Sequence, residues 1–427
     1  EVLTKGYMPE FERGSFDGGY GVVIDIGTTT VVTALIDLKT GEELADASMI
    51  NAQKRYGLDV LTRITYEYEH PDCGILKLQQ AIVNSINGMI EEACKEAGIE
   101  QRNILKIHVA ANCTMMHMLL GVDARSIGKS PYKPEFTEAK ELPAKDIGIE
   151  AAEDAILYCL PQVSAYIGAD IVAGAYVCEL QKERGNVLFI DIGTNGEMIL
   201  GSKSRLVTCS TAAGPALEGA KIACGMRGTD GAVDHVRFED GVWRFTTIGG
   251  RPPVGLCGSG LLDLNAQLLK QGLIDENGSL KSGQADPKIF FLVPPEDSGN
   301  GKGVYLTQKD IREIQLAKAA IAAGIQILMK TLSVTEEDIS CLYIAGAFGN
   351  YMDPASAGAI GLIPRSLTDR IRPIGNAAGE GAKIALLNAE EWKLADSLTR
   401  DVEFVELAAL PEFQDCFVDQ LEFPPQS

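Results

Sequence analysis

Two short segments of the chain have the residue types and spacing of a phosphate-binding turn. The same five residues occur as Ile24–Thr28 and again as Ile190–Thr194, each at the end of a β-branched or apolar run. In such a turn the glycine lets the backbone approach a phosphate, the threonines offer N–H and hydroxyl donors, and the aspartate can hold Mg2+ through water. One copy would be a weak signal, but the duplication predicts two homologous halves that grip one triphosphate from both sides.

The duplicated turns and a third segment define the residues expected to bind ATP and Mg2+. Asp25 and Asp191 are the expected metal ligands, and both are also candidates for a catalytic role. The third segment is an apolar strand near residue 345, after which two glycines leave room for a purine and ribose against the backbone. The predicted nucleotide-binding residues are Gly27, Thr28, Thr29 and Thr30 in the first turn, Gly193, Thr194, Asn195 and Gly196 in the second, and Gly346, Ala347, Gly349 and Asn350 after the strand.

A β-hairpin is expected to hold each turn. Val31–Leu38 reads as a strand with a turn at residues 39–41, and Glu197–Leu200 reads as a strand with a turn at residues 202–204. A P-loop or a Rossmann fingerprint would instead send its glycine-rich turn directly into a helix, so neither fits. Gly128-Lys129-Ser130 resembles the end of a P-loop, but no strand precedes it and Asp123 replaces the glycine expected five residues earlier.

Helix and strand patterns complete each half. Apolar residues recur mostly three and four positions apart over residues 75–93, which predicts a helix that stops at Gly98 and is followed by a strand at 104–110. In the second half, Thr307 begins a capping-box-like arrangement at the start of another apolar-periodic helix. A strand at Ile339–Ile344 follows that helix.

Composition narrows the classes of function. The chain has 427 residues, enough for two or three domains, and no run approaches the ~18 to 20 apolar residues of a membrane-spanning helix. A formal charge of -21 disfavours nucleic acid and anionic lipid as partners. The ten cysteines include no CxxC spacing, so neither a zinc site nor an iron–sulfur cluster is predicted. We therefore expect a cytoplasmic protein with free thiols.

Three motifs resemble those of the actin, sugar-kinase and heat-shock ATPase superfamily. Asp25–Thr30 and Asp191–Gly196 resemble its two phosphate motifs, and Gly346–Asn350 resembles its adenosine motif, in the chain order of that superfamily. The resemblance implies an α/β fold of two actin-like ATPase domains, a duplicated ribonuclease H-like fold with a central nucleotide cleft. Tyr166–Val177 and Ala355–Gly361 look like the two connecting helices, which would permit hinge motion.

The same resemblance implies domain boundaries and a catalytic residue. Residues 1–19 are expected to be a linker, 20–165 the first domain, 166–184 a connecting helix, 185–352 the second domain, and 353–427 the second connecting helix with a C-terminal segment. In the superfamily a polar side chain on the first connecting helix positions the attacking water, and Asp170 is the candidate here. It would act as a general base or orient the water, the alternative being a helix-surface or capping carboxylate.

A closer resemblance covers nearly the whole chain from Gly21 onward. The segments Gly21–Thr30, Ala213–Ala220, Gly258–Asp263 and Gly375–Ala377, together with the helix from Thr307, are similar to the C-terminal region of the reductive activators of corrinoid proteins. The resemblance implies an ATPase that helps to reduce cob(II)alamin to cob(I)alamin in a corrinoid protein of a methyltransferase system, such as that of an O-demethylase. The electron donor of that family is an N-terminal [2Fe-2S] domain, which we expect to be missing from this chain. The resemblance is also compatible with a homodimer.

Several alternatives stay open at this point. A small-molecule kinase or an ATP-driven switch protein of the same superfamily would share all three motifs. An activator of 2-hydroxyacyl-CoA dehydratases would need suitably placed cluster cysteines. Glu218 is either a group that helps to place Mg2+ or the hinge, or a carboxylate at a helix start. His117 and the three methionines around it look like core residues more than a cobalt-ligand box.

Overall fold

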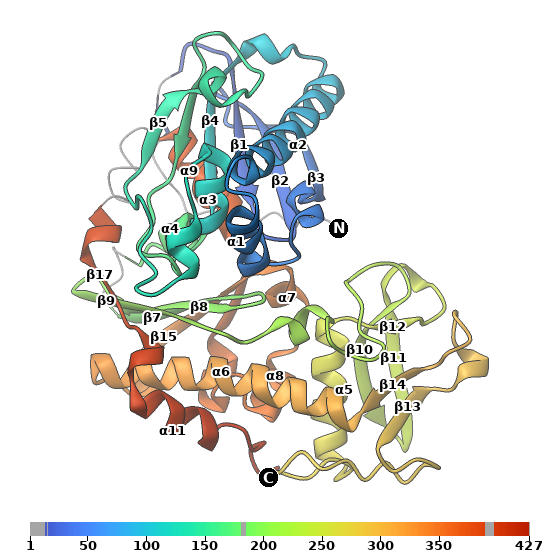
Figure 1. Cartoon of the computed structure of the whole chain (residues 1–427). Coiled ribbons are helices and arrows are strands. Elements are labelled where there is room, and N and C mark those ends of the chain that lie inside the picture. The colour runs from blue at the N-terminus through green and yellow to red at the C-terminus, as the bar shows by residue number, and fades with distance from the viewer. Residues whose placement is uncertain (1–12, 15, 181–184, 389–396, 427) are drawn as a thin grey trace. The chain divides into compact units, whose positions relative to one another are not determined.

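The computed structural model describes residues 13–14, 16–180, 185–388 and 397–426, and the chain folds into two compact units. Of the described residues, 13–180 and 377–404 form the first unit, and 185–376 and 405–426 form the second. Each unit contains a mixed sheet with helices packed on it (Figure 1). The predicted α/β class is therefore confirmed.

The sheet of the first unit places β1 next to the first phosphate turn. Its strand order is β3-β2-β1-β4-β6-β5, in which β1 pairs antiparallel with β2 and parallel with β4. Val22, Val23 and Ile24 of β1 are all buried, as expected for a strand that is covered on both faces. The strands are β1 (Tyr20–Ile26), β2 (Thr30–Asp37), β3 (Glu43–Ile50), β4 (Ile104–Ala111), β5 (Lys140–Pro143) and β6 (Ile156–Cys159).

Helices cover this sheet from both sides. α2 (Gly74–Ala97) contacts β2 and β3, whereas α9 (Ala377–Leu387) contacts β1 and β4, and Figure 1 shows α2 in front of the sheet and α9 behind it. Gly98 ends α2 in the left-handed conformation, which confirms the predicted stop. The other elements are η1 (Ala52–Arg55), α1 (Val60–Glu69), η2 (Gln101–Asn103), α3 (Cys113–Leu120), η3 (Arg125–Gly128), η4 (Ala144–Ile147), α4 (Ala169–Val177) and β17 (Val402–Phe404).

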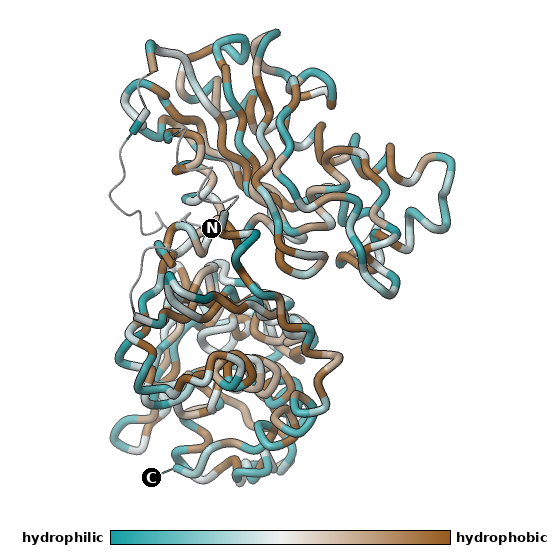
Figure 2. The backbone as a smooth tube through the Cα atoms, turned by 90° about the vertical axis from the view of Figure 1, so that its left-hand side faces the viewer, coloured by the Kyte–Doolittle hydropathy of each residue, from teal (hydrophilic) through white to brown (hydrophobic). Residues whose placement is uncertain are grey.

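The sheet of the second unit repeats the first. Five of its six strands, in the order β9-β8-β7-β15-β16, have the same directions and neighbours as β3-β2-β1-β4-β6, which confirms the predicted duplication. Figure 2 shows brown, hydrophobic stretches interleaved with teal, hydrophilic ones along the chain, and most side chains of the strands in this sheet are buried. The strands are β7 (Asn186–Ile192), β8 (Gly196–Ser202), β9 (Arg205–Thr211), β15 (Ile339–Ala345) and β16 (Ile371–Gly375).

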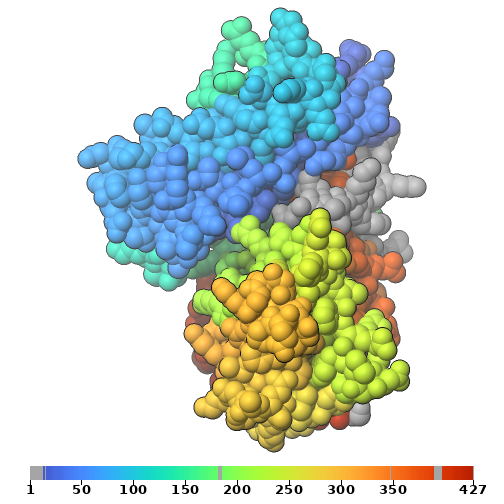
Figure 3. All heavy atoms as spheres, turned by 90° about the vertical axis from the view of Figure 1, so that its right-hand side faces the viewer, coloured from blue at the N-terminus to red at the C-terminus, as the bar shows by residue number. Residues whose placement is uncertain are grey.

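The main helix of the second unit is α6 (Gln308–Leu332), which packs on β8 and β9. Thr307 and Asp310 form the predicted capping box at its start. A further group of strands and helices lies between β9 and α6, and Figure 3 shows much of it (yellow-green to gold) on one face of this unit. It comprises η5 (Pro215–Glu218), β10 (Ala232–Glu239), β11 (Val242–Thr247), η6 (Ile248–Gly250), β12 (Gly255–Leu256), α5 (Gly258–Lys270), β13 (Ile289–Val293), η7 (Pro295–Asp297) and β14 (Val304–Thr307).

The second crossing of the chain lies later than the sequence predicted. The segment expected as the second connecting helix is α8 (Pro354–Ile360), which packs on α5 inside the second unit. The chain returns to the first unit at Ala377, where α9 packs on α4. A Cβ at Gly381 would lie 2.4 Å from the carbonyl oxygen of Ala173, so this helix pair needs the glycine. The remaining elements are α7 (Gly346–Tyr351), η8 (Glu336–Asp338), η9 (Arg365–Arg370), η10 (Leu407–Ala409) and α11 (Pro411–Asp419).

The first predicted connecting helix starts three residues late. Ser164 accepts hydrogen bonds from the N–H groups of Tyr166 and Ile167, and this turn delays the helix until Ala169. The resulting helix, α4, belongs to the first unit. Within the described part of the chain, none of the helices is both long and apolar enough to cross a membrane.

Candidate nucleotide-binding site

Asp25 and Asp191 occupy the same place in the two sheets. Asp25 lies beside Ala110 of the parallel neighbour β4, and Asp191 lies beside Ala345 of the parallel neighbour β15. Both side chains are half-buried at the carboxyl end of the central strand of their sheet. A carboxylate at this end can hold Mg2+ through water without leaving the sheet. The structure therefore gives each predicted metal ligand an equivalent setting in its own unit.

The first phosphate turn joins β1 to β2. Ile26 pairs with Val31, which leaves residues 27–30 as the loop, and the N–H of Gly27 donates to the carbonyl oxygen of Thr30 at 2.9 Å. A Cβ at Gly27 would lie 2.8 Å from that oxygen, so the tight turn needs glycine. Thr28, Thr29 and Thr30 are half-buried around the turn, as expected for groups that can meet a ligand.

The second phosphate turn is one residue shorter. Ile192 pairs with Gly196, so that only residues 193–195 form the loop, closed by a 2.9 Å bond from Gly193 N–H to the carbonyl oxygen of Asn195. Gly196 is buried in β8, where a Cβ would lie 2.8 Å from the hydroxyl oxygen of Thr211. The need for glycine at this position is thus explained by packing in the sheet. The identical pentapeptides did not reveal this difference in loop length.

Glu218 lies against the second turn. The hydroxyl of Thr194 donates to its carboxylate, at 3.4 Å to Oε1 and 3.3 Å to Oε2. Desolvation by the surrounding protein raises the pKa of Glu218, against the hydrogen bond from Thr194 and the charge of Arg227. Glu218 is the last residue of η5 and contacts the second turn through Thr194, and its role in placing Mg2+ stays a prediction.

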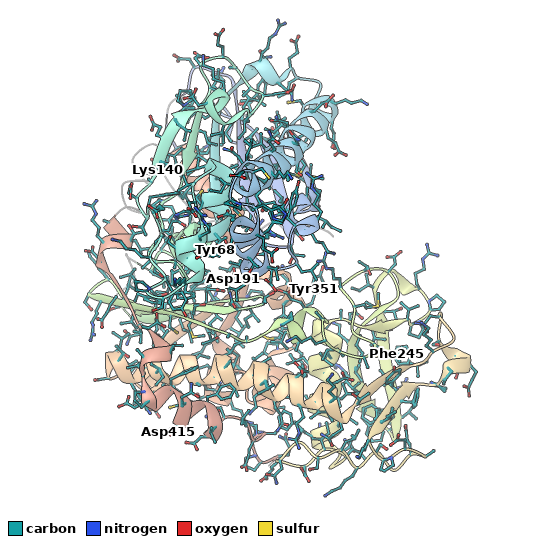
Figure 4. All side chains as sticks on the ribbon, in the orientation of Figure 1. Tyr68, Lys140, Asp191, Phe245, Tyr351 and Asp415 are labelled. Carbon is teal, nitrogen blue, oxygen red and sulfur yellow. The ribbon has the colours of Figure 1, made fainter. Side chains whose placement is uncertain are left out.

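The adenosine motif forms the short helix α7 directly after β15. Gly346 has a φ of 84°, and a Cβ there would lie 3.3 Å from Oδ1 of Asp191. A Cβ at Gly349 would instead lie 2.9 Å from the carbonyl oxygen of Ile344, so this glycine lets α7 pack on its own strand. α7 contacts β7, and Figure 4 labels Asp191 of β7 and Tyr351, the last residue of α7. Gly346 of this motif is therefore next to the expected Mg2+ ligand Asp191.

Gly258 lies where three elements of the second unit approach one another. A Cβ at Gly258, the first residue of α5, would lie 2.0 Å from the carbonyl oxygen of Leu217 and 3.0 Å from the ring of Phe348. Glycine at this position lets α5, η5 and α7 approach one another. Ala347 and Asn350 also belong to α7, and Asn350 has polar partners within the protein.

Asp170 lies at the start of α4, close to the first phosphate turn. Its Oδ1 accepts a 2.9 Å hydrogen bond from the N–H of Ile171, and a Cβ at Gly168 would lie 2.6 Å from the same oxygen and 2.5 Å from the Cα of Asn112. The side-chain amide of Asn112 donates to the hydroxyl oxygen of Thr28 at 3.0 Å. Burial raises the pKa of Asp170 to about 6. Such a pKa suits a general base that works near neutral pH.

Asn112, Asn51 and Arg63 also contact the first turn, although the sequence did not single them out. The side-chain amide of Asn51 donates to the carbonyl oxygen of Gly27 at 2.9 Å, and Nη2 of Arg63 donates to that of Thr28 at 2.5 Å. These side chains stand 24 to 84 residues away from the turn in sequence. Asn112 directly follows β4, just as the adenosine motif directly follows β15, the equivalent strand of the second unit. This equivalent position is the local signal that could have suggested Asn112.

The Met115–Met118 segment belongs to the core, as the sequence predicted. His117 is buried, its Nδ1 donates to the carbonyl oxygen of Cys113 at 2.8 Å, and its Nε2 accepts from the N–H of Glu135 at 3.1 Å. Burial also lowers the pKa of His117. All ten cysteines are free thiols. Over the described ranges, no three His, Cys, Asp or Glu side chains come together as a metal site.

Known proteins are similar to this chain over both units. Residues 185–427 match the model for the C-terminal domain of RACo, the ASKHA domain, and residues 20–183 match that for the RACo middle region. The corrinoid activation enzyme RamQ of Eubacterium limosum is 36% identical over 414 residues, which cover 93% of this chain and 69% of the relative. A [Co(II) methylated amine-specific corrinoid protein] reductase of Methanosarcina barkeri is 26% identical over 439 residues, which cover 95% and 77%.

A solved structure agrees with these matches. The reductive activator for corrinoid, iron-sulfur protein is 38% identical and superposes with a TM-score of 0.85, over 97% of this chain and 67% of that chain. The two matched regions together span the duplicated sheets, both phosphate turns and the adenosine motif. The chain therefore belongs to the RACo family, the reductive activators of corrinoid proteins.

Proposed function

We propose that this chain binds and hydrolyses ATP to help the reduction of a corrinoid protein from the cob(II)alamin to the cob(I)alamin state. The observation that carries the proposal is the equivalent placement of Asp25 and Asp191 beside glycine turns at the same edge of two duplicated sheets. The names of two relatives, a corrinoid activation enzyme and a corrinoid protein reductase, support a corrinoid protein as the partner.

The donors of each unit, taken separately, are of the kinds that Mg-ATP requires. Asp25 and Asp191 would hold Mg2+ through water, and Mg2+ would neutralise charge on the phosphates. Thr28 and Thr29 would donate to phosphate oxygens from the first turn, and Thr194 from the second. The ribose and purine would lie against the backbone at Gly346, whose lack of a side chain leaves room beside Asp191.

Asp170 is the proposed base or water-orienting group for hydrolysis. Gly168, two residues before it, lies close to the backbone of Asn112, whose side chain binds Thr28 of the first turn. The raised pKa of Asp170, about 6, keeps the carboxylate largely ionised at neutral pH and basic enough to accept a proton. Thr194 lies on the second turn and donates to Glu218 at the end of η5, and this pair is proposed to help position the phosphates there.

Nucleotide binding would assist electron transfer because it is energetically coupled to binding of the corrinoid protein. A coupling free energy of ~1 to 3 kcal/mol between the two ligands corresponds to roughly 40 to 130 mV for one electron. Assistance of this size is useful for a couple of low potential. In this proposal the electrons come from a [2Fe-2S] donor and pass to cobalt when the partner is bound.

Binding of Mg-ATP is the experiment that tests the proposal. At a ligand concentration of ~100 times the dissociation constant, Mg-ATP should stabilise the protein by about 2.7 kcal/mol, measured by thermal unfolding. Asp25→Ala and Asp191→Ala should each lose most of this gain while unfolding normally without nucleotide, because neither change removes a large apolar group. The absence of any shift with ATP, ADP or their analogues would rule the proposal out.

A small-molecule kinase is the second candidate, because it would use the same motifs. Phosphate release from ATP should be measured with a corrinoid protein and, separately, with a panel of sugars and carboxylic acids. Stimulation by the corrinoid protein supports the activator, whereas transfer of the γ-phosphoryl group to a small acceptor supports the kinase.

A further inference from the structure

We infer that Arg63 is a buried positioning residue for phosphate binding, which holds the first turn so that its amide groups face the nucleotide. The inference rests on the proposed binding of Mg-ATP. Arg63 lies in α1, outside every motif that the sequence suggested for the nucleotide. Its guanidinium reaches the turn from the side of the protein interior, together with the side chain of Asn51.

All four carbonyl oxygens of the turn accept hydrogen bonds from the protein. The oxygen of Gly27 accepts from Nδ2 of Asn51 and that of Thr28 from Nη2 of Arg63, at 2.9 and 2.5 Å. The oxygen of Thr29 accepts from the N–H of Asn51, and that of Thr30 from the N–H of Gly27, both at 2.9 Å. Carbonyl oxygens would repel a phosphate, and each of them is engaged by the protein instead.

The amide groups of the same turn are left available for a ligand. Among the described residues, the N–H groups of Thr28 and Thr29 have no hydrogen-bond acceptor. Arg63 binds the oxygen of the peptide group that joins these two threonines, and the N–H of that peptide group belongs to Thr29. A cation on the oxygen polarises the peptide and makes its N–H a stronger donor. Successive free N–H groups of this kind form an anion-binding concavity.

Arg63 is held in place by partners that leave its charge uncompensated. It is 0% exposed, Nε donates to the carbonyl oxygen of Gly57 at 3.0 Å, and Nη1 contacts Oε1 of Gln53 and the sulfur of Met115, at 3.2 and 3.0 Å. No carboxylate of the described residues forms an ion pair with it, although Asp59 acts on it from farther away. Burial lowers the pKa of Arg63 to about 10, so it remains a cation at neutral pH. An unpaired buried cation is unfavourable in the free protein, and an anionic ligand at the turn would relieve that cost.

The experiment compares ligands that do and do not carry phosphate. Arg63→Met removes the charge and keeps an unbranched side chain. Arg63→Lys keeps the charge but loses the planar guanidinium group with its several N–H donors. The control is Arg55→Met, which changes an exposed arginine on the preceding helix, η1. Calorimetry with Mg-ATP, inorganic tripolyphosphate and adenosine should give at least about tenfold weaker binding of the first two ligands to Arg63→Met. Arg63→Lys should lose less, adenosine should bind equally to all variants, and Arg55→Met should match the parent protein.

The outcomes separate this inference from the proposed function. If the unchanged protein does not bind Mg-ATP, the proposed function is wrong. If it does, and both Arg63 variants bind Mg-ATP and tripolyphosphate as tightly as the control, Arg63 does not position the turn. An equal loss for adenosine would also overturn the inference, because it would indicate general damage to the fold. If neither variant folds, hydrogen exchange at the N–H groups of Thr28 and Thr29 is measured in the unchanged protein. Mg-ATP should slow exchange at both amides, and unchanged exchange would overturn the inference.

Discussion

Asp170 is the residue whose surroundings bear most directly on hydrolysis. If it acts as a base, its ionised form must be present, and burial raises its pKa to about 6. Turnover of ATP should therefore rise with pH between about 5 and 7 and then level off. Asp170→Asn should lower turnover about 100-fold or more and should affect Mg-ATP affinity far less.

Phosphate release at several pH values, together with calorimetry, checks the role of Asp170. Asp154→Asn is a suitable control, because Asp154 is an exposed carboxylate in the same unit. Turnover in Asp170→Asn equal to that of the control would remove Asp170 from the mechanism.

Glu67 gives a prediction about stability and pH. It is buried on α1, one oxygen accepts from the N–H of Ala124 at 3.0 Å, and burial raises its pKa from 4.5 to about 7. Since the folded state binds this proton more tightly than the unfolded state, stability should fall as pH rises from about 4.5 to 7. Glu67→Gln should be more stable than the parent at pH 8, by at most ~3 kcal/mol, and less so at pH 5. Urea unfolding at both pH values, with the exposed Glu69→Gln as control, measures the difference.

The residues of the site differ in how far the sequence could predict them. Asp25 and Asp191 were predictable because each lies beside a glycine turn within a repeated pentapeptide. Arg63 and Asn51 were not, since they act on backbone carbonyl oxygens of residues that are distant in sequence. The pairing of such side chains with a turn depends on the tertiary fold, and no local pattern records it. The assignment of all these residues to a nucleotide stays a prediction.

At the scale of elements, the strands, their turns and the first connecting helix, α4, were predicted to within a few residues, whereas the second connecting helix was assigned to the wrong segment. The hairpins and α2 have strong periodic patterns and turn residues, which act locally. The segment Ala355–Gly361 does form a helix, α8, but a helix rich in small residues can pack on any close neighbour. The choice between α8 and α9 as partner of α4 depends on the contact of Gly381 with Ala173, which requires the fold.

The link between β15 and α7 gives a prediction at this scale. Gly346 and Gly283 both have positive φ, 84° and 67°, but a Cβ would lie 3.3 Å from Oδ1 of Asp191 at Gly346 and in open space at Gly283. Alanine at either position should lower the free energy of unfolding by about 1 to 2 kcal/mol, because of the left-handed backbone. Only Gly346→Ala should also weaken Mg-ATP binding, since its methyl group would crowd Asp191. Urea unfolding and calorimetry test the pair, and equal nucleotide affinity in both variants would contradict the assignment of Gly346 to the site.

At the scale of the whole molecule, the duplication explains why a repeated pentapeptide predicted the arrangement of both sheets. Equal strand order in the two sheets places the repeated aspartates at equivalent edges, so one pattern defines both halves. The strands and helices from β10 to β14 have no counterpart among the repeated elements of the first unit, and although Gly258–Asp263 resembles a family segment, the sequence did not predict these elements. Such an insertion is absent from the shared pattern of the two halves and therefore cannot be inferred from it.

The partner prediction also belongs to the whole molecule, because it requires nucleotide and corrinoid protein to influence each other. An activator must engage the inactive state and release its product, so the chain should bind a cob(II)alamin-containing protein at least about tenfold more tightly than the methylated or cob(I) form. Mg-ATP should change that affinity by a factor of about 5 to 150, and by linkage the partner should change the affinity for Mg-ATP by the same factor. Calorimetry with the partner in each cobalt state, with and without Mg-ATP, measures both effects. Asp191→Ala should keep the preference for cob(II)alamin but lose the effect of nucleotide. Equal affinity for all cobalt states, with no influence of ATP, would contradict the activator and favour the small-molecule kinase.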